Sequence, residues 1–132
     1  MAEVNFELVT PEALVFSGPA DMVVVPGTEG DFGVMQGHAP LMSTVRPGFL
    51  EIHTGASVER VFLTGGFADV NPSGLTVLAD EALKESDLDA PLFDRLIATA
   101  ERDIERATGE VEGANARQRL ADLQFMRGQA RV

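Results

Sequence analysis

The sequence predicts an α+β protein: an N-terminal β-sandwich of about ten short strands, followed by an antiparallel hairpin of two helices. Up to about residue 84, short apolar runs alternate with turn residues roughly every 8–12 residues, as is typical of β-sandwiches and barrels. After residue 89 the apolar residues recur with the period of a helix. We therefore expect a sandwich domain over residues 1–86 and a helical hairpin domain over residues 87–132.

The candidate strands are short apolar or alternating runs. No long helical pattern separates them, which disfavours a parallel α/β sheet. Asn71-Pro72-Ser73-Gly74 has the residue order of a type I turn, so the runs on either side of it should pair as a hairpin. The expected strands contain residues 4–9, 13–16, 21–25, 32–35, 49–53, 58–63, 66–70 and 75–78.

Two helices are expected, over residues 89–107 and 114–128. Asp89 is a suitable N-cap, and Pro91 fits the first turn, where its missing N–H costs nothing. Gly109 and Gly113 predict a break and a turn between the helices. The apolar stripes that should face one another consist of Leu92, Leu96, Ala100 and Ile104 on the first helix and Ala116, Leu120, Leu123 and Met126 on the second.

Residues 26–42 form a glycine-rich stretch with four glycines and two prolines. Pro26-Gly27 suits the centre of a type II turn. The spacing of Gly27, Gly30 and Gly33 can imitate a phosphate-binding loop, but no Gly-Lys-Ser/Thr leads into a helix, and residues 32–35 look like a strand. The stretch is better explained as a shaped surface loop between strands.

The charge distribution excludes some classes of function. The net charge is −11, whereas a nucleic-acid binder would be basic, so no nucleic-acid partner is expected. Residues 1–113 hold 20 acidic against 6 basic residues. The last 19 residues instead hold four arginines against Asp122 alone, which suggests either a docking tail or a solvated basic helix face. Those arginines are Arg117, Arg119, Arg127 and Arg131.

The sequence offers little for catalysis or for metal binding. There is no cysteine, and the two histidines lack the spacing of metal ligands, so we expect neither a metal site nor a catalytic residue. His38 as a general base is the alternative, but its Gly-His-Ala-Pro setting favours a loop or contact residue. The N-terminus lacks the features of a signal peptide, and no apolar run approaches the roughly 20 residues of a spanning helix. We expect a cytosolic or stromal protein.

Two blocks of the sequence resemble the epsilon subunit of the bacterial rotary ATP synthase, which is called delta in mitochondria. The first contains Gly27, Gly30 and Gly33, then Gly37-His38-Ala39-Pro40-Leu41, and ends with Pro47-Gly48. The second contains Gly65-Gly66-Phe67-Ala68-Asp69-Val70 and Thr76-Val77-Leu78-Ala79-Asp80. With the overall layout, the resemblance covers nearly the whole chain. The alternative is a small β-sandwich binding module or enzyme with a helical tail, although the absence of Trp and Tyr disfavours an aromatic-lined pocket.

The resemblance implies a non-catalytic rotor subunit of the central stalk, a part of the proton-transporting ATP synthase. The sandwich would bind the gamma subunit through His38, Ser43 and Thr10, and a loop with Glu29 and Asp31 would reach the ring of c subunits. Ser43 stands where the family often has Thr. The complex would lie at the cytoplasmic face of the bacterial plasma membrane, and this chain would touch the membrane only through its partners.

The resemblance also implies a regulatory role for the helices. In some members the hairpin opens and its second helix enters the catalytic head of alpha and beta subunits, where the four arginines could meet acidic residues. Other members bind ATP through an Ile/Leu-Asp-x-x-Arg-Ala motif. Here Leu88-Asp89 is followed by Leu92-Phe93 in place of Arg-Ala, so ATP binding is expected to be weak or absent and no cofactor is expected.

Overall fold

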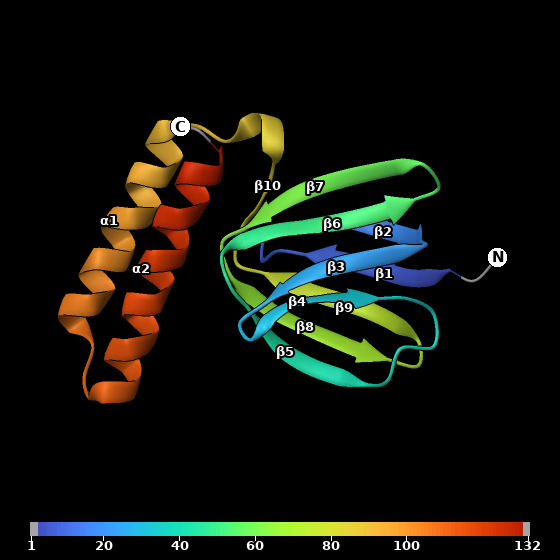
Figure 1. Ribbon diagram of the computed structural model, residues 1–132, viewed down its shortest axis with the longest axis horizontal. Coiled ribbons are helices and arrows are strands. Elements are labelled where there is room, and N and C mark those ends of the chain that lie inside the picture. The colour runs from blue at the N-terminus through green and yellow to red at the C-terminus, as the bar shows by residue number, and fades with distance from the viewer. Residues whose placement is uncertain (1–2, 131–132) are drawn as a thin grey trace. The chain divides into compact units, whose positions relative to one another are not determined.

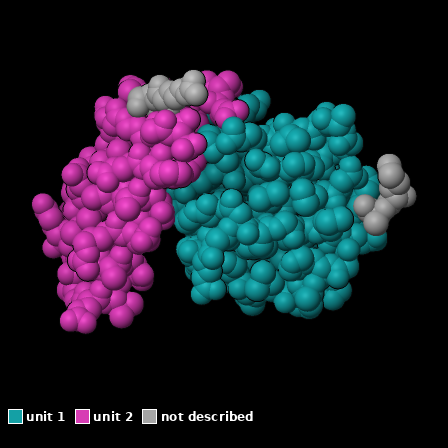
Figure 2. Space-filling view, in the orientation of Figure 1, with its two compact units in different colours: residues 1–84 teal, residues 85–132 magenta. Residues whose placement is uncertain are grey.

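The computed structural model describes residues 3–130. The chain forms two compact units, residues 1–84 and residues 85–132, which Figure 2 colours separately. The first unit therefore ends two residues before the boundary expected from the sequence. The reason is local: the last strand ends at Lys84, and a short 3-10 helix, Glu85–Asp87, begins the second unit.

The described residues form ten strands and two α-helices, which confirms the α+β fold class. All eight candidate runs are strands, and the Asn71–Gly74 turn joins two of them as expected. The strands are β1 (Val4–Val9), β2 (Leu14–Ala20), β3 (Met22–Gly27), β4 (Gly30–Val34), β5 (Leu41–Val45), β6 (Gly48–Thr54), β7 (Ser57–Leu63), β8 (Gly66–Asn71), β9 (Gly74–Ala79) and β10 (Ala82–Lys84).

The strands form one sheet that folds over on itself as a sandwich (Figure 1). The order is β10-β7-β6-β3-β5-β8-β9-β1-β2, and β4 pairs with β3 outside this path. All pairs are antiparallel except β1 with β9. The sheet bends between β3 and β5, where the two strands share only the pair Gly27↔Val45.

The core of the sandwich is mainly aliphatic, and the fully buried Phe6 ring lies within it. Val, Leu and Ile side chains from strands on both sides fill it, and Leu8, Val25, Leu50 and Val77 are fully buried. The ring of Phe6 packs 5.5 Å from that of Phe16. In β1, β6, β8 and β9 alternate residues face this core, because successive side chains point to opposite faces of a sheet.

The second unit contains the helices α1 (Ala90–Arg106) and α2 (Glu110–Ala130). On α1 the buried residues are Phe93, Leu96 and Ala100. On α2 they are Gly113, Leu123 and Met126. Four of the eight residues of the expected stripes are therefore buried, and the other four are half-buried.

Three local expectations were wrong. Pro26-Gly27 is not a turn: β3 continues through both residues, and the turn lies at Thr28-Glu29. Leu41 and Met42, expected at the end of the loop, begin the strand β5. The second helix begins at Glu110 rather than 114, because the N–H of Gly113 donates to Gly109 O and the Thr108 hydroxyl donates to the Glu112 carboxylate.

The start of α1 depends on Asp89. Its carboxylate accepts a hydrogen bond of 2.9 Å from the N–H of Leu92, so it is the N-cap expected from the sequence. We expect Asp89→Ala to lower the free energy of unfolding by about 0.5–2 kcal/mol, since a backbone N–H loses its partner. Urea unfolding monitored by circular dichroism measures this. Asp89→Asn should keep most of the stability, and equal losses for both variants would contradict a capping role.

Candidate functional site

The tip of the β3–β4 hairpin presents the two carboxylates that the sequence singled out. Glu29 lies in the turn and Asp31 at the start of β4, and both are exposed. The turn is tight: a Cβ atom on Gly27 would lie 2.8 Å from Gly30 O and 2.9 Å from the Phe32 ring. A glycine at position 27 therefore permits the close approach of the two strands.

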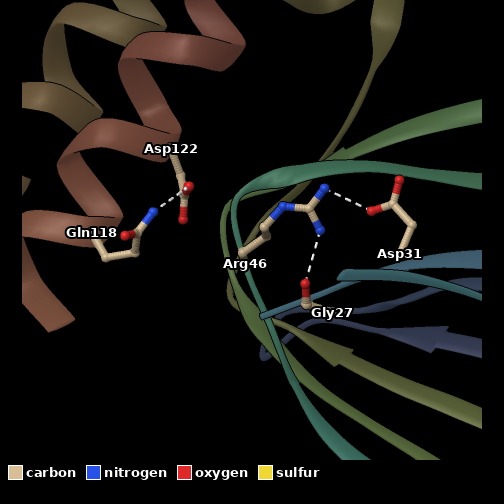
Figure 3. A network of polar contacts seen from close by, with 5 residues as sticks. All are labelled: Gly27, Asp31, Arg46, Gln118 and Asp122. Carbon is tan, nitrogen blue, oxygen red and sulfur yellow. Dashed lines mark hydrogen bonds and ion pairs between the residues drawn. The ribbon is translucent and has the colours of Figure 1, made fainter. Parts of the chain in front are cut away.

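Arg46 holds this hairpin in place (Figure 3). Its Nη2 donates to Asp31 Oδ1 at 2.6 Å, and its Nη1 donates to Gly27 O at 2.9 Å. The backbone N–H of Arg46 also donates to Pro26 O at 2.9 Å. Asp31 is thus a partner in an ion pair that fixes the hairpin, a role that sequence reasoning did not predict.

A hollow of about 420 Å³ lies beside the hairpin tip. It is lined on one side by Thr28, Glu29, Gly30, Asp31 and Phe32, and on the other by Leu41, Met42, Ser43 and Thr44 of β5. The Thr28 and Thr44 hydroxyls share a hydrogen bond of 2.7 Å across it. The structure therefore brings Ser43 together with Glu29 and Asp31, although the sequence assigned them to different surfaces.

His38 and Thr10, which were grouped with Ser43, lie elsewhere. The half-buried His38 contacts Ala39 O through Nδ1 at 2.7 Å and lines a smaller hollow of about 140 Å³ with Asn5 and residues 70–74. Thr10 follows β1 at its other end, where its hydroxyl donates to Ala13 O at 3.3 Å. Thr10 lies five residues along the chain from Asn5, which corresponds to about 17 Å in an extended strand.

An exposed apolar row crosses the outer face of the sheet and was not predicted from the sequence. The pairings Phe67↔Leu78, Leu78↔Val9 and Val9↔Leu14 place these side chains beside one another on β8, β9, β1 and β2. Leu78 is 53% and Leu14 57% exposed, whereas Phe67 and Val9 are half-buried. We call these four residues the apolar row. Thr10 borders it, and Thr44 on β5 pairs with Phe67 at its other end.

The apolar row had a signal in the sequence. Phe67 and Leu78 belong to the Gly-Gly-Phe and Thr-Val-Leu-Ala-Asp blocks; Phe67 precedes the core residue Ala68, and Leu78 lies between the core residues Val77 and Ala79. Strand alternation alone therefore puts Phe67 and Leu78 on the outer face, where adjacent apolar residues form a candidate contact surface.

The arginines of α2 have different surroundings. Nη1 of Arg127 donates to Asp94 Oδ1 of α1 at 2.6 Å, so it joins the two helices. Arg119 lines an open groove of about 310 Å³ with Asp103, Arg106, Glu112, Asn115 and Ala116, and Arg117 is exposed. Within α2 the Gln118 amide donates to Asp122, as Figure 3 also shows. Arg131 lies outside the described residues.

Two further features bear on chemistry. Within residues 3–130, no group of three or more His, Asp or Glu side chains is placed to hold a metal ion. No helix of the described chain has the length and apolar content needed to cross a membrane.

Comparison with known proteins gives concordant results. Residues 3–85 match the family described as ATP synthase, Delta/Epsilon chain, beta-sandwich domain. The chain is 51% identical over 129 residues to the ATP synthase epsilon chain of Parvibaculum lavamentivorans, covering 96% of this chain and 98% of that one. It is 50% identical over 123 residues to the ATP synthase epsilon chain of Rhodospirillum rubrum, covering 92% of each.

Solved structures with low identity share the fold. A chain in the mitochondrial ATP synthase of Euglena gracilis, a structure of OSCP, F1 and c-ring, superposes with a TM-score of 0.72 at 20% identity, covering 98% of this chain and 82% of that one. A chain in the central stalk and c-ring of the Tetrahymena thermophila mitochondrial ATP synthase gives 0.57 at 14% identity, covering 80% of this chain and 96% of that one. Because the family model covers more than half of the chain and relatives near 50% identity cover nearly all of it, this chain belongs to the ATP synthase delta/epsilon chain family.

Proposed function

We propose that this chain is a non-catalytic subunit of the central stalk of a proton-transporting ATP synthase, and that it connects the gamma subunit to the c-ring. The observation that carries the proposal is the apolar row on a sandwich of this family. Contiguous exposed apolar side chains mark a surface that a partner covers. Relatives that align over nearly the whole chain are named ATP synthase epsilon chain, which supports the same complex for this chain.

We assign the apolar row as the surface that binds the gamma subunit. Phe67, Leu78, Val9 and Leu14 offer it an apolar centre, and Thr10 adds a polar border. Interfaces commonly combine a desolvated apolar core with a polar rim. By resemblance, His38 and Ser43 extend the contact beyond this row, and the β3–β4 hairpin with Glu29 and Asp31 faces the c-ring. The chain would then associate with the cytoplasmic side of the membrane through the complex.

Reconstitution with purified partners tests this assignment. The full-length chain, immobilised through a C-terminal tag, should retain the gamma subunit of the same complex and, in its presence, the c-ring in detergent. Retention of c-ring without gamma would invert the proposed order. Failure to retain gamma would remove the stalk assignment altogether.

The helices are proposed as a weak regulatory element that reaches the catalytic head of alpha and beta subunits through Arg117, Arg119, Arg127 and Arg131. Opening the hairpin would expose Leu123 and Met126 and break the Arg127–Asp94 pair. Each buried side chain is worth about 1.5–3 kcal/mol, and an exposed ion pair at most about 1 kcal/mol. Charge alone therefore cannot hold an open form, so the closed hairpin should dominate unless the head buries the same apolar face.

ATP binding should be weak or absent. The Asp89 carboxylate, which belongs to the partial motif, already accepts the Leu92 N–H, and Phe93 is fully buried where the motif has Ala. Without the motif's arginine, ATP loses a charge-assisted hydrogen bond of about 1.5–3 kcal/mol, roughly tenfold or more in affinity. Calorimetry on the full chain should show no micromolar binding. A micromolar dissociation constant would contradict the prediction.

A further inference from the structure

The hollow beside the hairpin tip exists because β5 is paired along one of its edges and almost unpaired along the other. β5 pairs with β8 over all five of its residues, but with β3 only at Gly27↔Val45. The N–H of Thr28 also donates to Thr44 O at 3.1 Å. Residues 41–43 therefore have an open edge that faces the hairpin tip. The space between them, about 420 Å³, falls within the range of volumes of small-ligand sites.

The lining of this hollow has an apolar wall and a set of hydrogen-bond acceptors. Phe32, Leu41 and Met42 form the apolar part. The Ser43 hydroxyl donates to Thr44 O at 2.9 Å, so its oxygen presents only lone pairs to a ligand. In the Thr28–Thr44 pair one hydroxyl proton is used between the two oxygens. This set accepts hydrogen bonds more readily than it donates them.

Two carboxylates line the hollow, and an arginine pairs with one of them. Asp31 is paired with Arg46, whose guanidinium also binds Gly27 O. Glu29 is the other lining carboxylate, and within residues 3–130 it takes part in no ion pair. Among the described residues, no lysine or arginine lines the space. A cationic group is the ligand that this arrangement complements.

We propose that the hollow binds an arginine side chain of a partner subunit. Its guanidinium would donate to Glu29 and to the Ser43 and threonine hydroxyls, while its aliphatic stem would lie against Phe32 and Met42. A planar group with five donors suits several convergent acceptors better than an ammonium does. This site deepens the proposed function, since it gives the hairpin a recognition chemistry for the partner it faces.

Nuclear magnetic resonance of the ¹⁵N-labelled full chain tests the proposal with two peptides. Acetyl-Gly-Arg-Gly-amide should shift the amides of Gly30 and Ser43 in a saturable way, with a dissociation constant on the order of millimolar. The citrulline peptide, which has the same shape without the charge, should bind about 3- to 5-fold more weakly. Equal binding of the two peptides, or no shift at about 20 mM peptide, would overturn the proposal.

Two variants locate the effect. Glu29→Gln should weaken the binding of the arginine peptide by about 3- to 5-fold and leave the binding of the citrulline peptide unchanged. Glu59→Gln, which removes an exposed carboxylate on β7 outside the hollow, should change neither. If Glu29→Gln and Glu59→Gln behave alike, the peptide responds to net charge and the site is not the one proposed.

The outcome is separable from that of the proposed function. Glu29→Gln leaves the apolar row intact, so it should retain the gamma subunit as the parent chain does. Loss of peptide binding with normal retention of gamma supports a distinct arginine site. Peptide binding by a chain that never retains gamma would refute the stalk assignment but leave this site in place.

Discussion

A Leu78→Glu subunit should fold normally but lose most of its affinity for the gamma subunit. Leu78 is the central side chain of the apolar row and is 53% exposed, so glutamate can stay in water in the free subunit. In the complex the carboxylate would be enclosed among Phe67, Val9 and the partner without a counter-charge. Burying an unpaired charge is one of the most costly changes at an interface.

The expected loss is about 2–4 kcal/mol, or roughly 30- to 1000-fold in Kd, the range of an interface hot spot. Calorimetric titration with purified gamma subunit measures it. Val58→Glu is the matched control, because Val58 is 52% exposed on β7 and lies outside the apolar row. Similar losses for both variants would mean that the apolar row is not the gamma-binding surface.

The strands could be predicted from the sequence where their signal is local. Alternation and turn residues marked β1, β6, β7, β8 and β9, and Asn71–Gly74 marked a hairpin. β5 escaped prediction because Leu41 follows a proline within a glycine-rich stretch, and its main pairing is with β8, about 25 residues further along. A strand whose pairing partners are distant in the sequence has only a weak pattern in its own residues.

The predicted start of the second helix was wrong because of a single glycine. Gly113 has a low intrinsic preference for helix, which predicted a break there. In the structure Gly113 is buried, and an added Cβ would lie 3.2 Å from Nη1 of Arg117, one turn further along α2. The N–H of Gly113 donates to Gly109 O and the Thr108 hydroxyl to the Glu112 carboxylate, so local hydrogen bonds extend the helix through a residue whose propensity costs about 1 kcal/mol.

The candidate site was predicted only in part. The sequence pointed to Glu29 and Asp31 and to Ser43, and all three line one hollow. It could not reveal that Arg46 neutralises Asp31, because the two residues are 15 positions apart and meet only through the fold. Nor could it separate Thr10 from His38, since their distance depends on the register of β1 against β9.

A large loss of stability in the sandwich should come from Gly66→Ala. Gly66 begins β8 with φ of +148°, a conformation that residues with a Cβ rarely adopt. Its added Cβ would lie 2.1 Å from Leu78 O and 2.9 Å from Ala79 Cα, both backbone atoms of the paired strand β9. Neither atom can rotate away, so β8 and β9 would have to separate locally.

Backbone strain costs about 1–3 kcal/mol and overpacking about as much again, so Gly66→Ala should lower the free energy of unfolding by about 2–5 kcal/mol. Urea unfolding of the full chain, followed by the β-sheet circular dichroism signal, measures it. Gly55→Ala is the control: φ is +60° there, but no atom lies within 4 Å of the added Cβ, so only about 1–2 kcal/mol of strain is expected. If the two variants lose equal stability, the contact with Leu78 O is relieved by movement of the strand, and Gly66 is required for its backbone conformation alone.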